Sequence, residues 1–453
     1  MALWVAIPLG LVGHREAVYV GAIMGFDEKQ ADGLGGQVEF WSSVEYGSFL
    51  KGLVRELCAH GSSAECAARN AECAQAATFS QARATGAAGR TPGTRLLDTR
   101  NAISAPAIGA RQCFAVTEVD YRQSRGTVAR LLLRWRCYVD YPLQLRRRIR
   151  QEEPAAALVV STNTFYAPWV AMRAARRTGV PVVHWMLDLF PDVLVLASKL
   201  RAGSWAERRL RRWVRSMFDG AAANVFLGSR LLAYAEAQFG PIPRAKVIPI
   251  GCDAAPFAGR PPLPREEYGP VRLLYCGNFG RMHEVDTIVQ SFRVGVSTGV
   301  QFDFRGIGPG MIALAAAVRE FGLGEQVRLS GGLPEAEWLE AMGAADVALV
   351  TMKPGAEGIV MPSKTYSAMA AGQAVLAVCP RESDLADLII AHDCGWVVEP
   401  GDVNGLRAAL AEIEQDVGGL LAKRKRAWLA ARACYSAEAL AHRWAEVFRT
   451  VAK

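Results

Sequence analysis

Residues 355–372, Gly355-Ala-Glu-Gly-Ile-Val-Met-Pro-Ser-Lys-Thr-Tyr-Ser-Ala-Met-Ala-Ala-Gly372, are the most informative stretch of this chain. A mostly apolar segment at 346–351 precedes them, and another at 374–378 follows them. Pro362 near the first helical turn and Gly372 just beyond the last predict a short helix between these two segments. Strands that alternate with helices in this way are typical of a doubly wound α/β sheet.

Lys364 falls in the first turn of this predicted helix, where the helix dipole disfavours a cation by roughly 0.3–1 kcal/mol. A residue that breaks a local rule often marks a functional site. Together with Ser363 and the free backbone N–H groups of the first turn, the lysine is suited to bind an anion, most simply a phosphate. Glu357 and Gly358 lie just upstream, on a loop expected to face the same ligand. The alternative is a solvated lysine on a surface helix.

A glycine-containing loop follows the strand predicted at 271–276 and carries Gly277, Gly280 and Arg281. The glycines allow the backbone to approach a diphosphate closely. A guanidinium can pair with two phosphate oxygens at once. The alternative is an ordinary surface turn between a strand and a helix, but beside the other motifs we favour a phosphate site.

A second glycine turn, which carries Gly306 and Gly308, follows a strand predicted at 302–305. Its Gly-x-Gly spacing is not accompanied by the rest of the dinucleotide fingerprint, so it implies no NAD. We expect this turn to lie beside the first one, at the nucleotide.

The first half of the chain has a comparable loop. The strand predicted at 180–187 leads into Asp188-Leu-Phe-Pro-Asp192, and open α/β sheets bind ligands at the carboxyl ends of their strands. Asp188 is therefore a candidate for the acceptor side of a site. His184, on the strand itself, is either a core histidine or a catalytic one.

Four segments carry a resemblance to a known family, in this order along the chain: 275–283, 304–310, 343–350 and 355–372. In this order and spacing they resemble the retaining glycosyltransferases of family four, particularly a bacterial branch with Pro-Ser-Lys at this place. The resemblance covers roughly 155–448. It implies an α/β protein with the GT-B fold, in which two Rossmann-like doubly wound domains face each other across a cleft.

The resemblance also implies roles for the candidate residues. Arg281 and Lys364 would neutralise the diphosphate that leaves a nucleotide-sugar donor. Glu357 would hold hydroxyls of the donor sugar or stabilise positive charge at its anomeric carbon. Asp188 would act across the cleft. The chain has no Asp-x-Asp motif, so we expect neither a metal nor another cofactor, since the nucleotide-sugar is a substrate.

Ser367 departs from the family pattern. Relatives carry an acidic residue at this place, which is thought to bind the ribose hydroxyls. A hydrogen bond to a carboxylate is worth about 1.5–3 kcal/mol and a neutral one roughly 0.5–1.5 kcal/mol, so we expect weaker donor binding. Ser367 therefore leaves open a non-catalytic donor-binding subunit. A sugar-nucleotide epimerase of the same fold is a separate alternative.

A chain of 453 residues is long for one hydrophobic core. We predict an acceptor-side domain at 1–250, a proline-rich linker at 251–268 and a nucleotide-sugar domain at 269–435. A terminal helix at 436–453 is expected to pack back on the first domain. Residues 61–112 are rich in Ala, Arg, Ser and Gly and indicate a poorly ordered insertion.

The net charge of +8 indicates an anionic partner. Two arginine-rich segments, 128–150 and 205–218, are predicted to be helices, and such helices can lie in a membrane interface. Because many relatives use lipid-linked acceptors, we expect a lipid-linked or saccharide acceptor and contact with an anionic membrane. The alternative is that the apolar stripes pack on the sheet while the arginines face water. No nucleic-acid motif is present, so we expect no nucleic-acid partner.

Several features indicate a cytoplasmic protein that is peripheral on the inner face of the cell membrane. The apolar residues 1–12 follow no basic region and predict a first buried strand instead of a signal peptide.

Gly33–Gln37 precedes a helix-like run that ends at Leu57, and this turn is a further candidate for the donor. The ten cysteines form no Cys-x-x-Cys pair, so we expect reduced thiols and no structural zinc.

Overall fold

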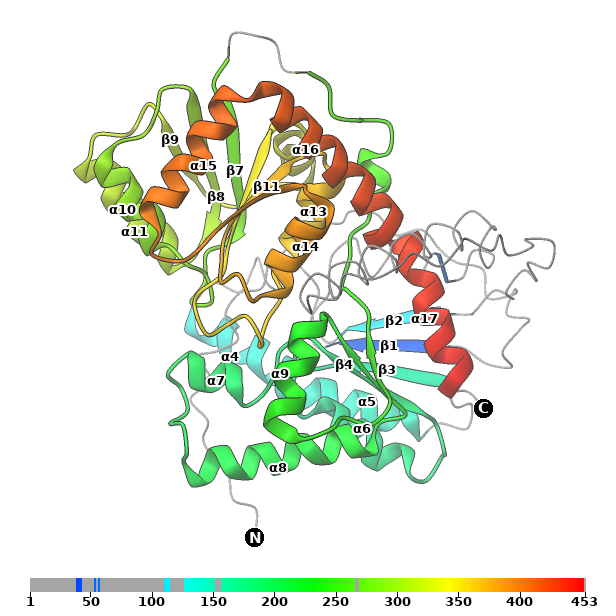
Figure 1. The fold of residues 1–453 in the computed structure, drawn as a ribbon. Coiled ribbons are helices and arrows are strands. Elements are labelled where there is room, and N and C mark those ends of the chain that lie inside the picture. The colour runs from blue at the N-terminus through cyan, green and yellow to red at the C-terminus, as the bar shows by residue number, and fades with distance from the viewer. Residues whose placement is uncertain are drawn as a thin grey trace, which may run out of the picture.

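The computed structural model describes residues 38–42, 53, 56–57, 110–114, 126–150, 156–264 and 269–451. In this part of the chain the strands form two sheets, and all strand pairs are parallel (Figure 1). The strand orders are β2-β1-β3-β4-β5-β6 and β12-β11-β10-β7-β8-β9. Both orders reverse direction within the sheet, as doubly wound folds do.

The first sheet belongs to the amino-terminal half. Its strands are β1 (Val38–Ser42), β2 (Ala110–Phe114), β3 (Ala157–Ser161), β4 (Val182–Met186), β5 (Ala223–Phe226) and β6 (Ala245–Val247). Its helices are α4 (Thr127–Trp135), η2 (Arg136–Asp140), α5 (Tyr141–Ile149), α6 (Ala167–Ala175), α7 (Asp192–Leu196), α8 (Trp205–Gly220) and α9 (Ser229–Phe239). Every residue of β3, β4 and β5 is buried, because helices cover both faces of a parallel sheet.

The second sheet has the same design. Its strands are β7 (Val271–Asn278), β8 (Val300–Ile307), β9 (Val327–Ser330), β10 (Val347–Thr351), β11 (Ala374–Val378) and β12 (Gly395–Val398). Its helices are α10 (Asp286–Val294), α11 (Pro309–Glu320), α12 (Glu335–Ala344), α13 (Lys364–Ala370), α14 (Asp384–His392), α15 (Val403–Gln415) and α16 (Val417–Ala430). The short segments η3 (Ala255–Phe257) and η4 (Ala431–Tyr435) precede β7 and follow α16.

The last helix, α17 (Ala437–Val451), crosses back to the first sheet (Figure 1). Trp444 is fully buried, and its ring meets that of Trp185 in β4 edge-on at 5.6 Å. Arg443 donates a hydrogen bond to the carbonyl of Val247 in β6. Cys252 of the linker forms a parallel bridge with Ser436. The chain therefore passes twice between the two halves, and the two crossings lie side by side.

The pattern of apolar segments predicted most described elements correctly. The helices expected at 128–150 and 205–218 are α4 to α5 and α8. One prediction near the amino terminus is wrong: residues 38–42 form β1, not the start of a helix after Gly33–Gln37. Of the expected insertion at 61–112, residues 110–112 belong to β2. Its remaining residues, the glycine cluster and residues 1–12 lie outside the described part.

The described core bears on three further expectations. Cys252, Cys379 and Cys394 are buried free thiols, but Cys434 is disulfide-bonded, so the expectation of reduced thiols is wrong there. His184 is a core residue of β4 with Nδ1 3.2 Å from Oδ1 of Asn224, and burial lowers its pKa to about 4. Within the described ranges, no helix is both long enough and apolar enough to span a bilayer.

Candidate functional site

Two glycine turns meet at the carboxyl ends of β7 and β8. The pairing of these strands runs through Gly277, which lies opposite Gly306. Beyond the strands, the backbone N–H of Phe279 donates to the carbonyl of Ile307 at 2.7 Å, and that of Gly310 donates to the carbonyl of Phe279 at 3.1 Å. The two turns therefore form one layer of backbone.

Positions 306 and 308 of this layer have room only for glycine. A Cβ atom on Gly306 would lie 1.8 Å from the carbonyl oxygen of Gly277, and one on Gly308 would lie 2.6 Å from that of Phe279. Gly308 also has a φ of +119° and Gly277 a φ of +131°, which side chains rarely adopt. The sequence predicted that the glycines would let the backbone approach a ligand closely. In the structure they let the two turns approach each other.

Lys364 lies beside this layer. It is the first residue of α13, after Ser363 at the cap position. Its Nζ donates to the hydroxyl of Tyr275 at 2.8 Å and lies 3.9 Å from the centre of that ring. The Tyr275 hydroxyl donates to the carbonyl of Asn278 at 2.9 Å. The lysine charge is therefore held next to the turn between Gly277 and Gly280.

Arg281 and Ser367 border the same place. Arg281 is exposed, and no ion pair joins it to another described residue. Its loop is tied to the end of β10, because Nδ1 of His283 lies 2.9 Å from the carbonyl oxygen of Thr351. Ser367 is half-buried and lies three residues after Lys364 on α13, so both lie on one helical face.

Glu357 lies on the loop between β10 and α13. Its Oε2 is buried and has no hydrogen-bond partner among the described residues. An unpaired buried carboxylate oxygen is costly. A hydroxyl group of a bound molecule would satisfy it, which is the role that the sequence resemblance implies for this residue.

The loop of Glu357 rests on the first half of the chain. The backbone N–H of Leu189 donates to the carbonyl of Ile359 at 3.3 Å, and the position of a Cβ on Gly355 lies 3.3 Å from Cδ1 of Leu196. Next to Leu189, the backbone N–H of Asp188 donates to the Thr162 hydroxyl at 3.2 Å. The structure therefore brings the loops of Asp188 and Glu357 together.

A second contact between the halves lies at the start of α9. The carboxylate of Asp384 accepts the backbone N–H groups of Arg230 and Leu231, each at 3.0 Å. The guanidinium of Arg230 binds Asp387 through two hydrogen bonds, at 2.6 and 3.0 Å. Burial raises the pKa of the Asp384 carboxyl. A Cβ on Gly228 would lie 2.1 Å from this carboxylate, so a side chain there would require Asp384 to shift.

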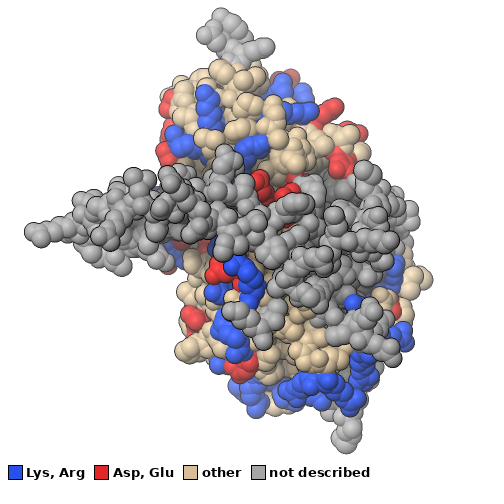
Figure 2. All heavy atoms as spheres, turned by 90° about the vertical axis from the view of Figure 1, so that its right-hand side faces the viewer, with Lys and Arg blue, Asp and Glu red and all other residues tan. Residues whose placement is uncertain are grey.

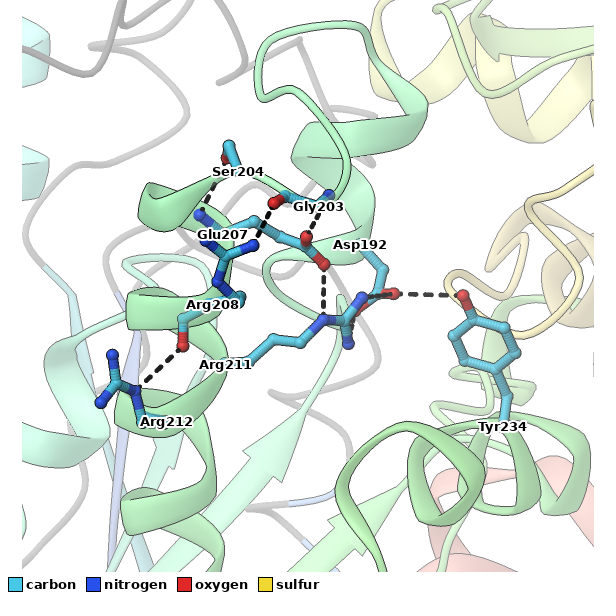
Figure 3. A network of polar contacts seen from close by, with 8 residues as sticks. All are labelled: Asp192, Gly203, Ser204, Glu207, Arg208, Arg211, Arg212 and Tyr234. Atoms are coloured by element: carbon cyan, nitrogen blue, oxygen red, sulfur yellow. Dashed lines mark hydrogen bonds and ion pairs between the residues drawn. The ribbon is translucent and has the colours of Figure 1, made fainter.

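A polar network beside the site was missed by sequence analysis (Figure 3). Asp192, at the start of α7, is only 4% exposed. It accepts hydrogen bonds from Arg211 of α8 at 2.7 and 3.2 Å and from the Tyr234 hydroxyl of α9 at 3.1 Å. Arg211 also binds Glu207 at 2.6 Å. Nothing in the spacing of these residues indicates that they meet, because they come from three helices. The contact of Tyr275 with Lys364 was also missed, because the two residues are far apart along the chain.

Two family models match the chain in succession. The one described as Glycosyltransferase Family 4 covers residues 102–255, and the one described as Glycosyl transferases group 1 covers residues 270–416. These two parts of the chain are therefore similar to glycosyltransferases. The boundary between the matches falls in the linker that precedes β7.

Named relatives agree with the family. The chain is 31% identical over 254 residues to "Probable glycosyltransferase WbjE" of Pseudomonas aeruginosa, a match over 52% of this chain and 61% of that protein. It is 28% identical over 193 residues to WcaL of Escherichia coli, which is named for colanic acid biosynthesis, over 41% and 47% of the two chains. The chain thus spans less than two thirds of either relative.

A solved structure gives the fold. The Anabaena protein HepE, in complex with UDP-glucose, superposes with a TM-score of 0.57 at 12% identity, over 91% of this chain and 98% of that one. This likeness confirms the predicted GT-B architecture of two Rossmann-like domains.

We predict that Gly306→Ala lowers the free energy of unfolding by about 1–3 kcal/mol, as overpacking does. The added methyl group would push β7 and β8 apart at the glycine layer. Chemical denaturation measures the change. Gly324→Ala is the matched control, because a Cβ there meets no atom within 4 Å. Equal stability of the two variants would contradict the close approach of the turns.

Proposed function

We propose that this protein transfers a sugar from a nucleotide-sugar donor to an acceptor, with retention of configuration, in the synthesis of a polysaccharide, an O-antigen or a glycolipid. The arrangement of Lys364 beside the glycine layer is the observation that best supports this proposal. HepE, a protein of the same fold, has been solved with UDP-glucose. WcaL, a relative named for colanic acid biosynthesis, supports a role in the synthesis of a polysaccharide.

In this proposal the donor diphosphate lies over the glycine turns of β7 and β8. Lys364 and Arg281 neutralise the charge that develops on the leaving group, so the reaction needs no metal ion. The sugar lies toward Glu357, whose buried oxygen accepts a hydroxyl. Asp188 lies on the acceptor side, since its loop touches that of Glu357 from the other half.

A non-catalytic donor-binding role is the second candidate, because position 367 holds serine where the resemblance leads us to expect an acidic residue. A neutral hydroxyl can hold a ribose hydroxyl only weakly in comparison with a carboxylate. In that case the nucleotide binds and no turnover follows. Gain of activity by Ser367→Glu would argue for the enzyme.

The nucleotide site is tested by a thermal-shift panel of UDP, GDP, ADP and dTDP. A ligand at one hundred times its dissociation constant stabilises the folded state by about 2.7 kcal/mol. We expect one nucleotide to stabilise the wild type, and Lys364→Ala and Arg281→Ala to abolish most of that shift. Arg319→Ala, which removes an equal charge from α11, serves as control and should keep it. No shift with any nucleotide would contradict the donor site.

We further propose that the acceptor is lipid-linked and that α4 holds the protein on an anionic membrane at the inner face of the cell membrane. No residue of α4 is buried. Val128, Leu131 and Trp135 are 79%, 57% and 50% exposed, and their spacing places them on one face. Arg130 and Arg134 alternate with them in sequence. An apolar stripe bordered by arginines suits an anionic bilayer.

The position of α4 supports this proposal. The segment that follows α4 is fixed to the loop after β3, because the Thr164 hydroxyl donates to the carbonyl of Cys137 at 2.8 Å. Thr162 of the same loop accepts the backbone N–H of Asp188. The segment that follows α4 is therefore linked to the loop of Asp188, which this proposal assigns to the acceptor, and a lipid-linked sugar would be delivered there.

The other basic helix, α8, is less suited to insertion into a bilayer. Phe218 is fully buried, and the ring of Trp213 packs edge-on against that of Trp169 at 5.4 Å. Arg208, Arg209 and Arg212 of α8 are exposed, and Figure 2 shows Lys and Arg gathered at the lower edge, the level at which α8 lies in Figure 1. This helix would add charge, with Trp205 as its exposed large apolar residue.

Vesicle co-sedimentation tests the membrane contact. We expect the protein to sediment with vesicles that contain phosphatidylglycerol and not with pure phosphatidylcholine. The double variant Leu131→Ser/Trp135→Ser should lose most of this binding, because the buried apolar area supplies much of the affinity. Trp205→Ser on α8 is the control and should bind much better than the double variant. Equal loss by both would contradict the assignment to α4.

A further inference from the structure

Tyr234 of α9 touches both halves of the site. A Cβ atom on Gly358 would lie 2.4 Å from its Cγ and 2.6 Å from its Cβ. The ring therefore lies directly against the backbone of Gly358. Since Gly358 follows Glu357, the tyrosine determines where the backbone of the glutamate can lie.

The other end of Tyr234 is fixed by the network in Figure 3. Its hydroxyl donates to Asp192 at 3.1 Å, and Arg211 fixes Asp192 through two hydrogen bonds. Burial and the nearby Asp192 charge raise the Tyr234 pKa to about 12. The phenol is therefore neutral at physiological pH and can donate this hydrogen bond. Arg211 is oriented in turn by Glu207, which accepts the backbone N–H of Gly203 at 2.7 Å.

The loop of Glu357 makes other contacts with the first half of the chain, through Ile359 and Gly355. These lie on either side of the Tyr234 contact along the chain. The first is a hydrogen bond from Leu189, and the second is the approach of Leu196 to the Gly355 backbone; Ile359 also shares one apolar core cluster with Leu189. The aromatic ring is the broad surface among them, and it packs on the residue next to the carboxylate.

We propose that Tyr234 is a positioning residue that places Glu357 against the donor sugar, with Asp192 and Arg211 holding the ring in place. This inference rests on the proposed function, since it assigns the group through which Tyr234 acts. It makes the glutamate's position depend on the contact between the two halves. Lys364 and Arg281, which would bind the diphosphate, lie outside this contact.

The test is a double-mutant cycle on transfer or donor hydrolysis, with Tyr234→Ala, Glu357→Gln and the double variant. Misplacement of a catalytic group by about 1 Å can cost on the order of 100-fold in rate, so we expect Tyr234→Ala to lower kcat at least about 10-fold. If Tyr234 acts through Glu357, the double variant turns over no more slowly than Glu357→Gln alone. The dissociation constant of the nucleoside diphosphate should be unchanged by Tyr234→Ala.

Two controls separate positioning from loss of stability. Tyr234→Phe keeps the ring against Gly358 but removes its hydrogen bond to Asp192, so its kcat should fall between those of the wild type and Tyr234→Ala. Leu231→Ala lies on the same helix at a side chain that is 1% exposed. It should lower the melting temperature, and whatever effect it has on kcat should multiply with that of Glu357→Gln.

The contact itself is tested by stability. Gly358→Ala introduces a methyl group into the Tyr234 ring and should lower the melting temperature, and Tyr234→Ala should restore part of that loss in the double variant. Absence of this rescue, or independent effects of Tyr234→Ala and Glu357→Gln in a wild type that turns over, would overturn the inference alone. A wild type that turns over no donor would instead overturn the proposed function, and this inference with it.

Discussion

The arrangement of the site depends on one carboxylate that crosses from one half of the chain to the other. Asp384 begins α14 in the second half and accepts the first free backbone N–H groups of α9 in the first half. A carboxylate at a helix amino terminus satisfies N–H groups that would otherwise be unpaired, and it complements the helix dipole. Because α9 carries Tyr234, this contact acts together with the Arg230–Asp387 pair and the Asp192 network to position the ring that meets Gly358. The glutamate next to it is placed as a consequence.

The two halves contribute different kinds of chemistry. The second half supplies backbone and positive charge at the ends of β7, β8 and β10, an arrangement suited to a diphosphate. The first half supplies the loop of Asp188 and the polar network around the buried Asp192, whose carboxylate accepts hydrogen bonds from Arg211 and Tyr234. A transferase needs this division, since the donor and the acceptor must each be held before they meet.

Local patterns in the sequence predicted the elements of the fold and the glycine turns. Gly306 and Lys364 could be recognised because each is unusual for its own position, whatever it contacts. The contacts of Tyr234, Tyr275 and Asp192 could not, since they join elements that are far apart along the chain. The disulfide of Cys434 was missed because spacing alone does not determine pairing. The burial of Phe218 and the packing of Trp213 could not be predicted, since they depend on how α8 packs against the rest of the first half.

The central claim is that a nucleotide-sugar binds at the turns of the second half, and hydrogen exchange with and without the bound nucleoside diphosphate tests it most directly. Backbone N–H groups that contact a ligand, or that its binding makes rigid, exchange more slowly. The account predicts slower exchange in residues 277–281, 306–310 and 362–367, with little change in α8. Protection confined to the first half, or no protection at saturating nucleotide, would contradict it.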